Sequence, residues 1–346
     1  DEDILYAHKP HIGTDVLIDV VSQMRQEIIS LGGEFCFHTQ VTDVDLTSKT
    51  LKLVHLSENS AEEVSAGAAV FAIGHSARDT FEMLYKHQIP MRAKSFAVGV
   101  RIEHPQTLID HSQYGRDRGN DLPAAAYKLT ENLDNGRGVY TFCMCPGGII
   151  VPAASGPNQL VVNGMSPSNR GSRWANSGMV VEIRPEDVDE QYAKYGNLKM
   201  MAFQEDLERL CYEQAGKTQN AGAQRMRDFV EGRASVDLPR TSYAPGIHPS
   251  RLDKWLPEQI GKRLQQGFRK FGSFARGFLT NEAILIGVES RTSSPVRIPR
   301  DRETMVHIRI DGLYPCGEGA GYAGGIVSAA MDGEKCAEAV AKLLNN

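Results

Sequence analysis

The most distinctive chemistry in the sequence is a concentration of glycines near its end. Five of the nine residues 317–325 are glycine, and Gly319, Gly321 and Gly324 match the pattern G-x-G-x-x-G. Because glycine has no Cβ, main-chain N–H groups in such a turn can approach a ligand closely. The helix expected to follow adds partial positive charge at its N-terminus. The turn therefore suits an electron-rich oxygen, on a phosphate or on a flavin ring that gains negative charge on reduction. A tight turn that only packs a helix on a sheet is the alternative.

We do not expect this turn to form a complete NAD-type Rossmann unit. That fingerprint opens a strand–helix–strand unit, with an acidic residue about 20 positions later that binds the ribose. Here a helical pattern with small residues on one face runs from Ile326 to Val340, and the sequence reaches Asn346 without a second strand. The pattern therefore predicts a strand, a glycine turn and a helix N-terminus.

Other side chains that could do chemistry are scattered. Arg291 lies in a serine-rich turn and could hold an anionic group; a solvated arginine is the alternative. Cys143 and Cys145 invite a redox or metal interpretation. One intervening residue strains an intramolecular disulfide, however, and nothing completes a zinc site, so we expect two partly buried thiols and no metal. His75 and His104 could move protons, although structural roles are expected. No catalytic acid or base is identified.

Length and composition indicate a globular protein of two domains, or of one domain with a large insertion. The chain has 346 residues, of which 41% are apolar and 23% charged. Its net charge of −5 argues against a general nucleic-acid binder. Residues 262–276 are basic with interleaved phenylalanines, which predicts an amphipathic helix with a solvated face; contact with nucleic acid is the alternative. Six scattered cysteines, and the lack of a signal peptide or a membrane-length apolar run, indicate a cytoplasmic location.

The elements that position these residues follow two kinds of secondary-structure pattern, an α/β pattern and an antiparallel β pattern. Near the start, apolar residues from Leu17 to Ile28 recur at helical spacing, with Thr14 as the expected N-cap and Gly32 and Gly33 as the stop. We then expect strands at 34–38, 41–46, 51–56 and 68–73, the last of them a buried parallel strand. This order is typical of an α/β layer.

From about Lys94 the pattern favours an antiparallel sheet, since strands follow one another without intervening helices. We expect these strands at 96–103, 138–143, 149–152, 159–163 and 179–184. Two helices follow, one with Phe203, Leu207, Leu210 and Cys211 on one face and one with Ile260, Leu264, Phe268 and Phe271. From about Thr280 the sequence returns to the α/β pattern.

Residues 312–326 resemble the last FAD-binding segment of flavoproteins of the glutathione-reductase type. In that family a strand ends in glycine and an acid that meets the ribityl–phosphate region, and the next helix points its N-terminus at the isoalloxazine. Gly317 and Glu318 match the glycine–acid pair. Residues 70–77 resemble another strand end of the family, with Ile73 in place of the usual threonine. Residues 33–45 resemble the strand whose backbone, near Val41, pairs with adenine.

Five further segments are similar to one bacterial family, the uncharacterised FAD-dependent dehydrogenases, also called NAD(FAD)-utilising dehydrogenases. These segments are 9–15, 96–105, 141–148, 163–166 and 289–295. The resemblance implies cofactor contacts at Val41, Ile73, Gly74, Ser76, Arg291, Gly317, Glu318, Gly319, Ala320, Gly321, Tyr322, Ala323, Gly324, Gly325 and Ile326.

The resemblance also implies the fold. An α/β FAD-binding domain is expected over residues 1–93 and 279–346, with an antiparallel α+β substrate domain inserted at 94–278. The family's first strand–helix–strand unit, which holds the ADP half of FAD, has no counterpart in residues 1–33, so this FAD-binding domain is expected to be incomplete. We expect the chain to be a fragment that binds FAD weakly or not at all and is inactive alone.

The expected function of the intact protein is that of an FAD-dependent oxidoreductase, resembling a dehydrogenase, with an unknown small-molecule substrate. NADH or NADPH are possible electron donors. The alternative is a flavin- or nucleotide-binding module without turnover, acting as a sensor or as a partner in RNA modification. The sequence does not predict the oligomeric state.

Overall fold

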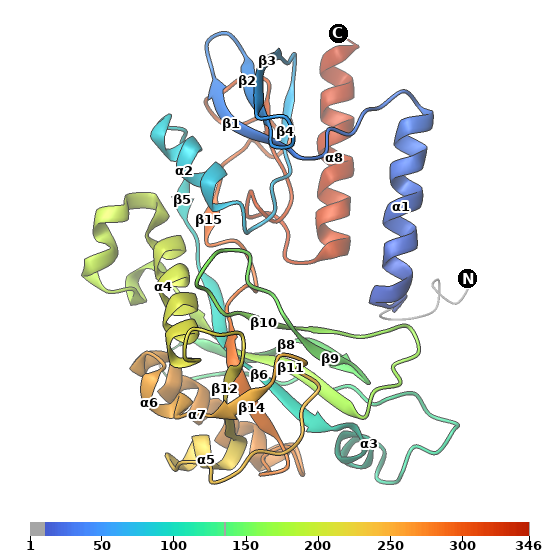
Figure 1. The fold of residues 1–346 in the computed structure, drawn as a ribbon, viewed down its shortest axis with the longest axis vertical. Helices are drawn as coiled ribbons and strands as arrows, with labels where there is room; N and C mark the ends of the chain where they lie inside the picture. The colour runs from blue at the N-terminus through green and yellow to red at the C-terminus, as the bar shows by residue number, and fades with distance from the viewer. Residues whose placement is uncertain (1–10, 135, 346) are drawn as a thin grey trace. The chain divides into compact units, whose positions relative to one another are not determined.

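The computed structural model describes residues 11–134 and 136–345, and these fall into two compact units. Unit 1 contains residues 11–34, Val98–Glu182 and Asp206–Ser290; unit 2 contains Phe35–Ala97, Ile183–Glu205 and residues 291–345. Three elements, β6 (Phe96–Pro105), β11 (Trp174–Ile183) and α4 (Lys199–Gln214), contain residues of both units, and most of the residues of each lie in unit 1 (Figure 1).

Unit 1 is built on a seven-stranded sheet in the order β13-β12-β14-β6-β11-β8-β7. Its strands are β6 (Phe96–Pro105), β7 (Thr130–Asn132), β8 (Gly138–Pro146), β11 (Trp174–Ile183), β12 (Ala221–Arg225), β13 (Ile247–Pro249) and β14 (Ile284–Glu289). β12 and β6 both pair antiparallel with β14, and β8 pairs antiparallel with β11 and β7, while β13 lies parallel to β12. The predicted antiparallel sheet is thus confirmed in part: the strands expected at 96–103, 138–143 and 179–184 lie in it, whereas those expected at 149–152 and 159–163 form a separate two-stranded sheet. β14, which the sequence analysis placed after the inserted domain, pairs within this sheet.

A two-stranded sheet and six helices complete unit 1. They are β9 (Ile149–Pro152), β10 (Val162–Met165), α1 (Thr14–Ser30), α3 (Gln106–Tyr114), α4 (Lys199–Gln214), α5 (Met226–Glu231), α6 (Leu252–Trp255) and α7 (Glu258–Phe274). α5, α6 and α7 pack on one another; α5 and α6 contact β12, and α7 contacts β8 (Figure 1). The face predicted for α7 is confirmed, because Ile260, Leu264, Phe268 and Phe271 are all buried. Apolar burial of this kind contributes about 25 cal/mol per Å², which fixes the helix on the unit.

Unit 2 combines three small sheets. β1 (Thr39–Asp45), β2 (Thr50–His55) and β3 (Ser60–Ser65) form an antiparallel meander. β4 (Ala69–Phe71) pairs parallel with β16 (Leu313–Pro315), and β5 (Arg92–Ala93) pairs antiparallel with β15 (Val296–Arg297). The helical elements are α2 (Arg78–Lys86), η2 (Pro185–Asp187), η3 (Glu190–Leu198) and α8 (Ile326–Leu344). The hydrophobic core of unit 2 includes Phe81, Leu84, Val296 and Ile298.

Three local expectations are wrong. The N-cap of α1 is Gly13, and the Thr14 hydroxyl instead donates to the carbonyl of Ser166. Residues 34–38 form no strand, and His38, the last of them, has a left-handed φ of 53° that separates them from β1. β3 was missed, since every residue in it is exposed and apolar alternation gives no signal.

The first and last helices, α1 and α8, bury fewer apolar residues than their sequence patterns predict. None of the residues of α1 is buried, and in α8 only Asp332 and Cys336 are. None of the helices in the described ranges is both long and apolar enough to cross a bilayer.

The closest backbone approach in the large sheet gives a first prediction. A Cβ on Gly99 of β6 would lie 1.9 Å from the Met179 carbonyl oxygen of β11, whereas one on Gly138 of β8 would meet only Tyr140 Cδ1, at 3.9 Å. Gly99→Ala should therefore lower the free energy of unfolding by about 1–3 kcal/mol, the usual cost of overpacking. Urea unfolding followed by circular dichroism measures this loss, with Gly138→Ala as the control. Equal stability of the two variants would contradict the prediction.

Candidate functional site

Two glycine-containing loops that are far apart in the sequence meet at one edge of unit 2. β4 and β16 run parallel, so their carboxyl ends lie at the same edge. The amide of Cys316 donates to the Phe71 carbonyl at 3.0 Å, just where both strands end. A Cβ on Gly319 would lie only 2.4 Å from the Gly74 carbonyl oxygen. The structure therefore brings together the two segments that sequence analysis singled out, 73–76 and 317–326.

The turn after β16 is fixed by hydrogen bonds within the chain. The Gly317 amide donates to Asp332 Oδ2 of α8 at 2.7 Å, and the Tyr322 amide donates to the Gly317 carbonyl at 3.0 Å. Asp332 is held in turn by Arg300, whose Nη1 also donates to the carbonyl of Pro315. Gly317 and Gly321 have φ values of 69° and 83°, the left-handed region that favours glycine. The path of the turn is thus set before any ligand is considered.

The glycines of the turn serve two different purposes. A Cβ on Gly319 or Gly321 would collide with the chain itself, in the second case at 2.9 Å from the Val296 carbonyl oxygen. A Cβ on Gly324 or Gly325 would meet no atom within 4 Å. Packing explains the first pair, as the alternative interpretation of the turn proposed. The second pair borders open space that a ligand can approach.

The open end of the turn carries main-chain donors. Among the residues that the structure describes, the amides of Gly325, Ile326 and Val327 have no hydrogen-bond partner. This is the normal state of the first turn of an α-helix, where N–H groups point outward and the helix dipole is positive. These donors fit the electron-rich oxygens of a flavin ring or a phosphate.

Basic side chains reinforce this character. Lys94 Nζ lies 3.2 Å from Ser293 Oγ, and burial lowers the pKa of Lys94, as does the nearby charge of Arg297, while Glu318 opposes the shift. Arg297 Nη2 donates to the Gly321 carbonyl at 2.7 Å. The pKa of Glu318 is raised by its own burial, against the effect of Lys94. The surroundings of the turn are therefore suited to an anionic or electron-rich group.

The loop after β4 adds a polar network to the same edge. Arg291 Nη1 donates to Ser76 Oγ at 2.9 Å, so the structure brings these two predicted residues together. His75 Nδ1 also lies 2.9 Å from Ser76 Oγ, and its Nε2 is 3.8 Å from a carboxylate oxygen of Glu318. The two loops are thus joined by side chains as well as by backbone contact.

The remaining predicted residues have varied surroundings. Ala320 is buried, and its carbonyl accepts the Ile298 amide; Ala323 is also buried, whereas Ile326 is exposed. Val41 pairs with Leu53 in the β1–β2 ladder and packs on the core of unit 2, so its place beside an adenine stays a prediction.

Lys94 and Arg297 were missed by sequence reasoning. Lys94 meets Ser293 across 199 positions of the chain, and no local pattern marks a contact of that range.

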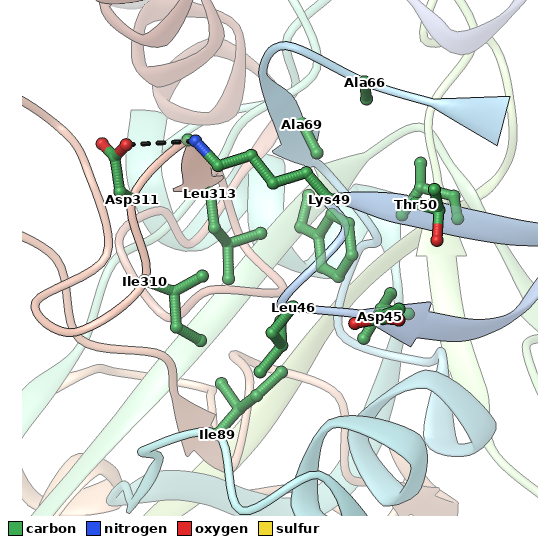
Figure 2. A pocket seen from close by; sticks show the side chains of 14 residues that line it. Asp45, Leu46, Lys49, Thr50, Ala66, Ala69, Ile89, Ile310, Asp311 and Leu313 are labelled. Carbon is green, nitrogen blue, oxygen red and sulfur yellow. Dashed lines mark hydrogen bonds and ion pairs between the residues drawn. The ribbon is translucent and has the colours of Figure 1, made fainter.

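Two other features of unit 2 are separate from this site. The hollow in Figure 2 is lined by Ala69 and Leu313, which begin β4 and β16, so it lies at the opposite ends of the strands from the glycine turn. Its rim carries an ion pair between Lys49 and Asp311, 3.1 Å apart.

Cys316, Asp332 and Cys336 cluster with ligand atoms within 4.8 Å of one another. Both Asp332 oxygens are already bound by Arg300, however, and one also accepts the Gly317 amide. The carboxylate therefore has an internal structural role.

Comparison with known proteins places the chain in a family. Residues 95–292 match the family model described as FAD-dependent protein, C-terminal domain-like, a range that includes Arg291 but not the turn after β16. An uncharacterized protein of Clostridium beijerinckii is 44% identical over 340 residues, which cover 97% of this chain and 62% of that relative. The chain thus spans about three fifths of the relative's length. On this evidence the chain belongs to the family of FAD-dependent proteins defined by that C-terminal domain.

Proposed function

We propose that the chain is part of an FAD-dependent oxidoreductase in which the turn between β16 and α8 faces the flavin. The observation that carries the proposal is the group of unpartnered amides at Gly325, Ile326 and Val327, which borders open space at the end of the parallel strand pair. A bound flavin would supply two-electron chemistry, accepting hydride from NADH or NADPH and passing it to a small-molecule substrate.

The residues of the chain would bind and orient the cofactor. The first-turn amides of α8 would donate to the oxygen-rich edge of the ring, where negative charge collects on reduction. Lys94 and Arg297 would balance that charge from the neighbouring loops. Arg291 would hold the Ser76 loop, through its bond to the serine hydroxyl.

The direct test compares this chain with the longer Clostridium beijerinckii relative after each is mixed with FAD and freed of unbound cofactor. A visible flavin spectrum in the relative, bleached by NADH or NADPH without oxygen, supports an oxidoreductase. Retention of FAD without bleaching by either donor favours a binding module, and no retained FAD in either protein contradicts the proposal.

A negative charge placed at the N-terminus of α8 tests whether FAD binds against the first-turn amides of this helix. Gly325 has φ 179°, extended backbone that any residue adopts, so Gly325→Asp and Gly325→Asn can both cap α8. Only the aspartate would bring a negative charge to the unpartnered amides. At FAD concentrations high enough to detect the weak binding expected of this chain, FAD should bind about tenfold more weakly to Gly325→Asp than to Gly325→Asn, a difference of about 1.4 kcal/mol. Flavin fluorescence titration measures both dissociation constants, and equal values would contradict the assignment.

The pH dependence of binding tests Lys94. Because its pKa is lowered by burial, Lys94 loses its proton at a lower pH than an ordinary lysine. The positive charge, and with it the affinity for FAD, should therefore fall as the pH rises through that lowered pKa. Lys94→Arg should keep the affinity at high pH, since arginine stays protonated. Lys94→Met should bind weakly at every pH. Matching pH profiles for the natural chain and Lys94→Arg would show that another group is responsible.

A further inference from the structure

A pair of cysteines in unit 1 lies beside a buried guanidinium. Cys143 and Cys145 are two residues apart on β8, and Cys143 is exposed while Cys145 is buried. Opposite them on β11, the register shifts between Asn176 and Gly178, which leaves an extra residue on β8. Cys143 has the left-handed φ of 47° found at such a bulge. Bulges of this kind re-aim side chains, and here one cysteine is exposed while the other is buried.

Arg101 of β6 is the charged group behind this pair. It is fully buried, and its Nη2 donates to the Cys143 carbonyl at 2.7 Å and to Cys145 Sγ at 3.4 Å. Nη1 donates to Glu289 of β14 at 3.1 Å, and Nε donates to Asn176 Oδ1 at 2.9 Å. The guanidinium is therefore held in one orientation, with part of its donor set turned toward the cysteines.

The guanidinium of Arg101 fits only because residue 164, which packs against it, is a glycine. A Cβ on Gly164 of β10 would lie 1.9 Å from Arg101 Nη2 and 2.3 Å from Asn176 Oδ1. Among the described residues, Glu289 Oε1 and Asn176 Nδ2 are buried polar atoms without a partner. The arginine is thus covered by backbone yet surrounded by polar groups that its own bonds do not fully satisfy, which is unusual for a purely structural cluster.

The electrostatics favour a thiolate on the exposed cysteine. The charged and titratable groups near Cys143 are Cys145, Arg101 and Glu289. The Cys145 S–H and the Arg101 charge lower the pKa of Cys143 to about 6. The hydrogen bond to Cys143, and then burial, raise the pKa of Cys145, and burial raises the pKa of Glu289 to about 7. Near neutral pH, Cys143 therefore carries the negative charge and Cys145 keeps its proton.

We propose that Cys143 and Cys145 form a redox-active thiol pair that is oxidised by peroxides, with Cys143 as the attacking thiolate and Cys145 as the resolving thiol. The Cys143 sulfur would attack a peroxide oxygen; an S–O bond forms, the O–O bond breaks, and the leaving oxygen takes a proton to become water or an alcohol. Cys145 then displaces the hydroxyl of the sulfenic acid, so an S–S bond forms and water leaves with the Cys145 proton. The pair loses two electrons and the peroxide gains them.

The backbone favours a reversible disulfide here. In a regular strand, residues two apart have Cα atoms about 6.6 Å apart, near the upper limit for a disulfide. Cys145 Sγ lies 3.4 Å from the Cys143 carbonyl oxygen, so the buried thiol is turned back toward Cys143. A disulfide that retains strain is easily reduced, so a small thiol such as glutathione would restore the pair.

The test uses hydrogen peroxide and dithiodipyridine on the full chain. At pH about 6.5, a thiol of pKa about 6 should react with this disulfide reagent about fivefold faster than a thiol of ordinary pKa, because its larger thiolate fraction outweighs its lower nucleophilicity. Cys36, which is also exposed, is the reference within the same molecule. Peptide mass spectrometry should then show that peroxide links Cys143 to Cys145 with the loss of two hydrogens, and that dithiothreitol reverses the change.

Two variants separate the roles. Cys145→Ser should leave a sulfenic acid on Cys143 that dimedone traps, and Arg101→Lys should slow the reaction of Cys143 relative to Cys36. Circular dichroism checks that each variant folds, and the peroxide test on the natural chain holds even where a variant does not. Reaction of Cys143 no faster than that of Cys36, or oxidation of Cys143 without a bond to Cys145, would overturn the proposal.

Discussion

The parallel pairing of β4 with β16 is the constraint on which the candidate cofactor site depends. Only three residue pairs form the ladder, yet it sets the ends of both strands at one edge. Without it, Gly74 and Gly319 would not approach each other, and the Ser76 loop would not meet the turn. The turn also fixes the orientation of α8, because the Gly317 amide and Arg300 both donate hydrogen bonds to Asp332 of the helix. The short β4–β16 ladder and the Asp332 carboxylate together determine where the amides of the first turn of α8 point.

The sequence predicted well what local pattern determines. The glycine turn, β9 and the buried face of α7 depend on spacing over a few residues, and the structure has them as expected. It predicted poorly what distant partners determine. The strand expected at 34–38 does not form despite its apolar residues, and Lys94 gains its surroundings from residues about 200 positions away. Such contacts leave no periodicity to read.

The helix α8 shows why apolar pattern alone misjudged burial. Its buried residues are Asp332 and Cys336; Cys336 packs with Tyr314 and Cys316 in a small cluster, while Ile326 and Val327 are exposed. A carboxylate that accepts a guanidinium and a main-chain amide gains charge-assisted hydrogen bonds, each stronger than a neutral one. These bonds fix the rotation of the helix, and with it the side that its small residues present.

Two guanidinium groups, those of Arg101 and Arg300, share three kinds of hydrogen-bond partner, and comparing them shows which arrangement can react. Arg101 and Arg300 each donate to a main-chain carbonyl, a carboxylate and a cysteine sulfur, the last at 3.4 and 3.5 Å. Around Arg300 both cysteines of the cluster are buried, so no reagent reaches them and the arginine serves to hold the turn. Around Arg101 one of the two is exposed. Because a thiolate must be both charged and accessible to react, the same arrangement is structural at Arg300 and reactive at Arg101.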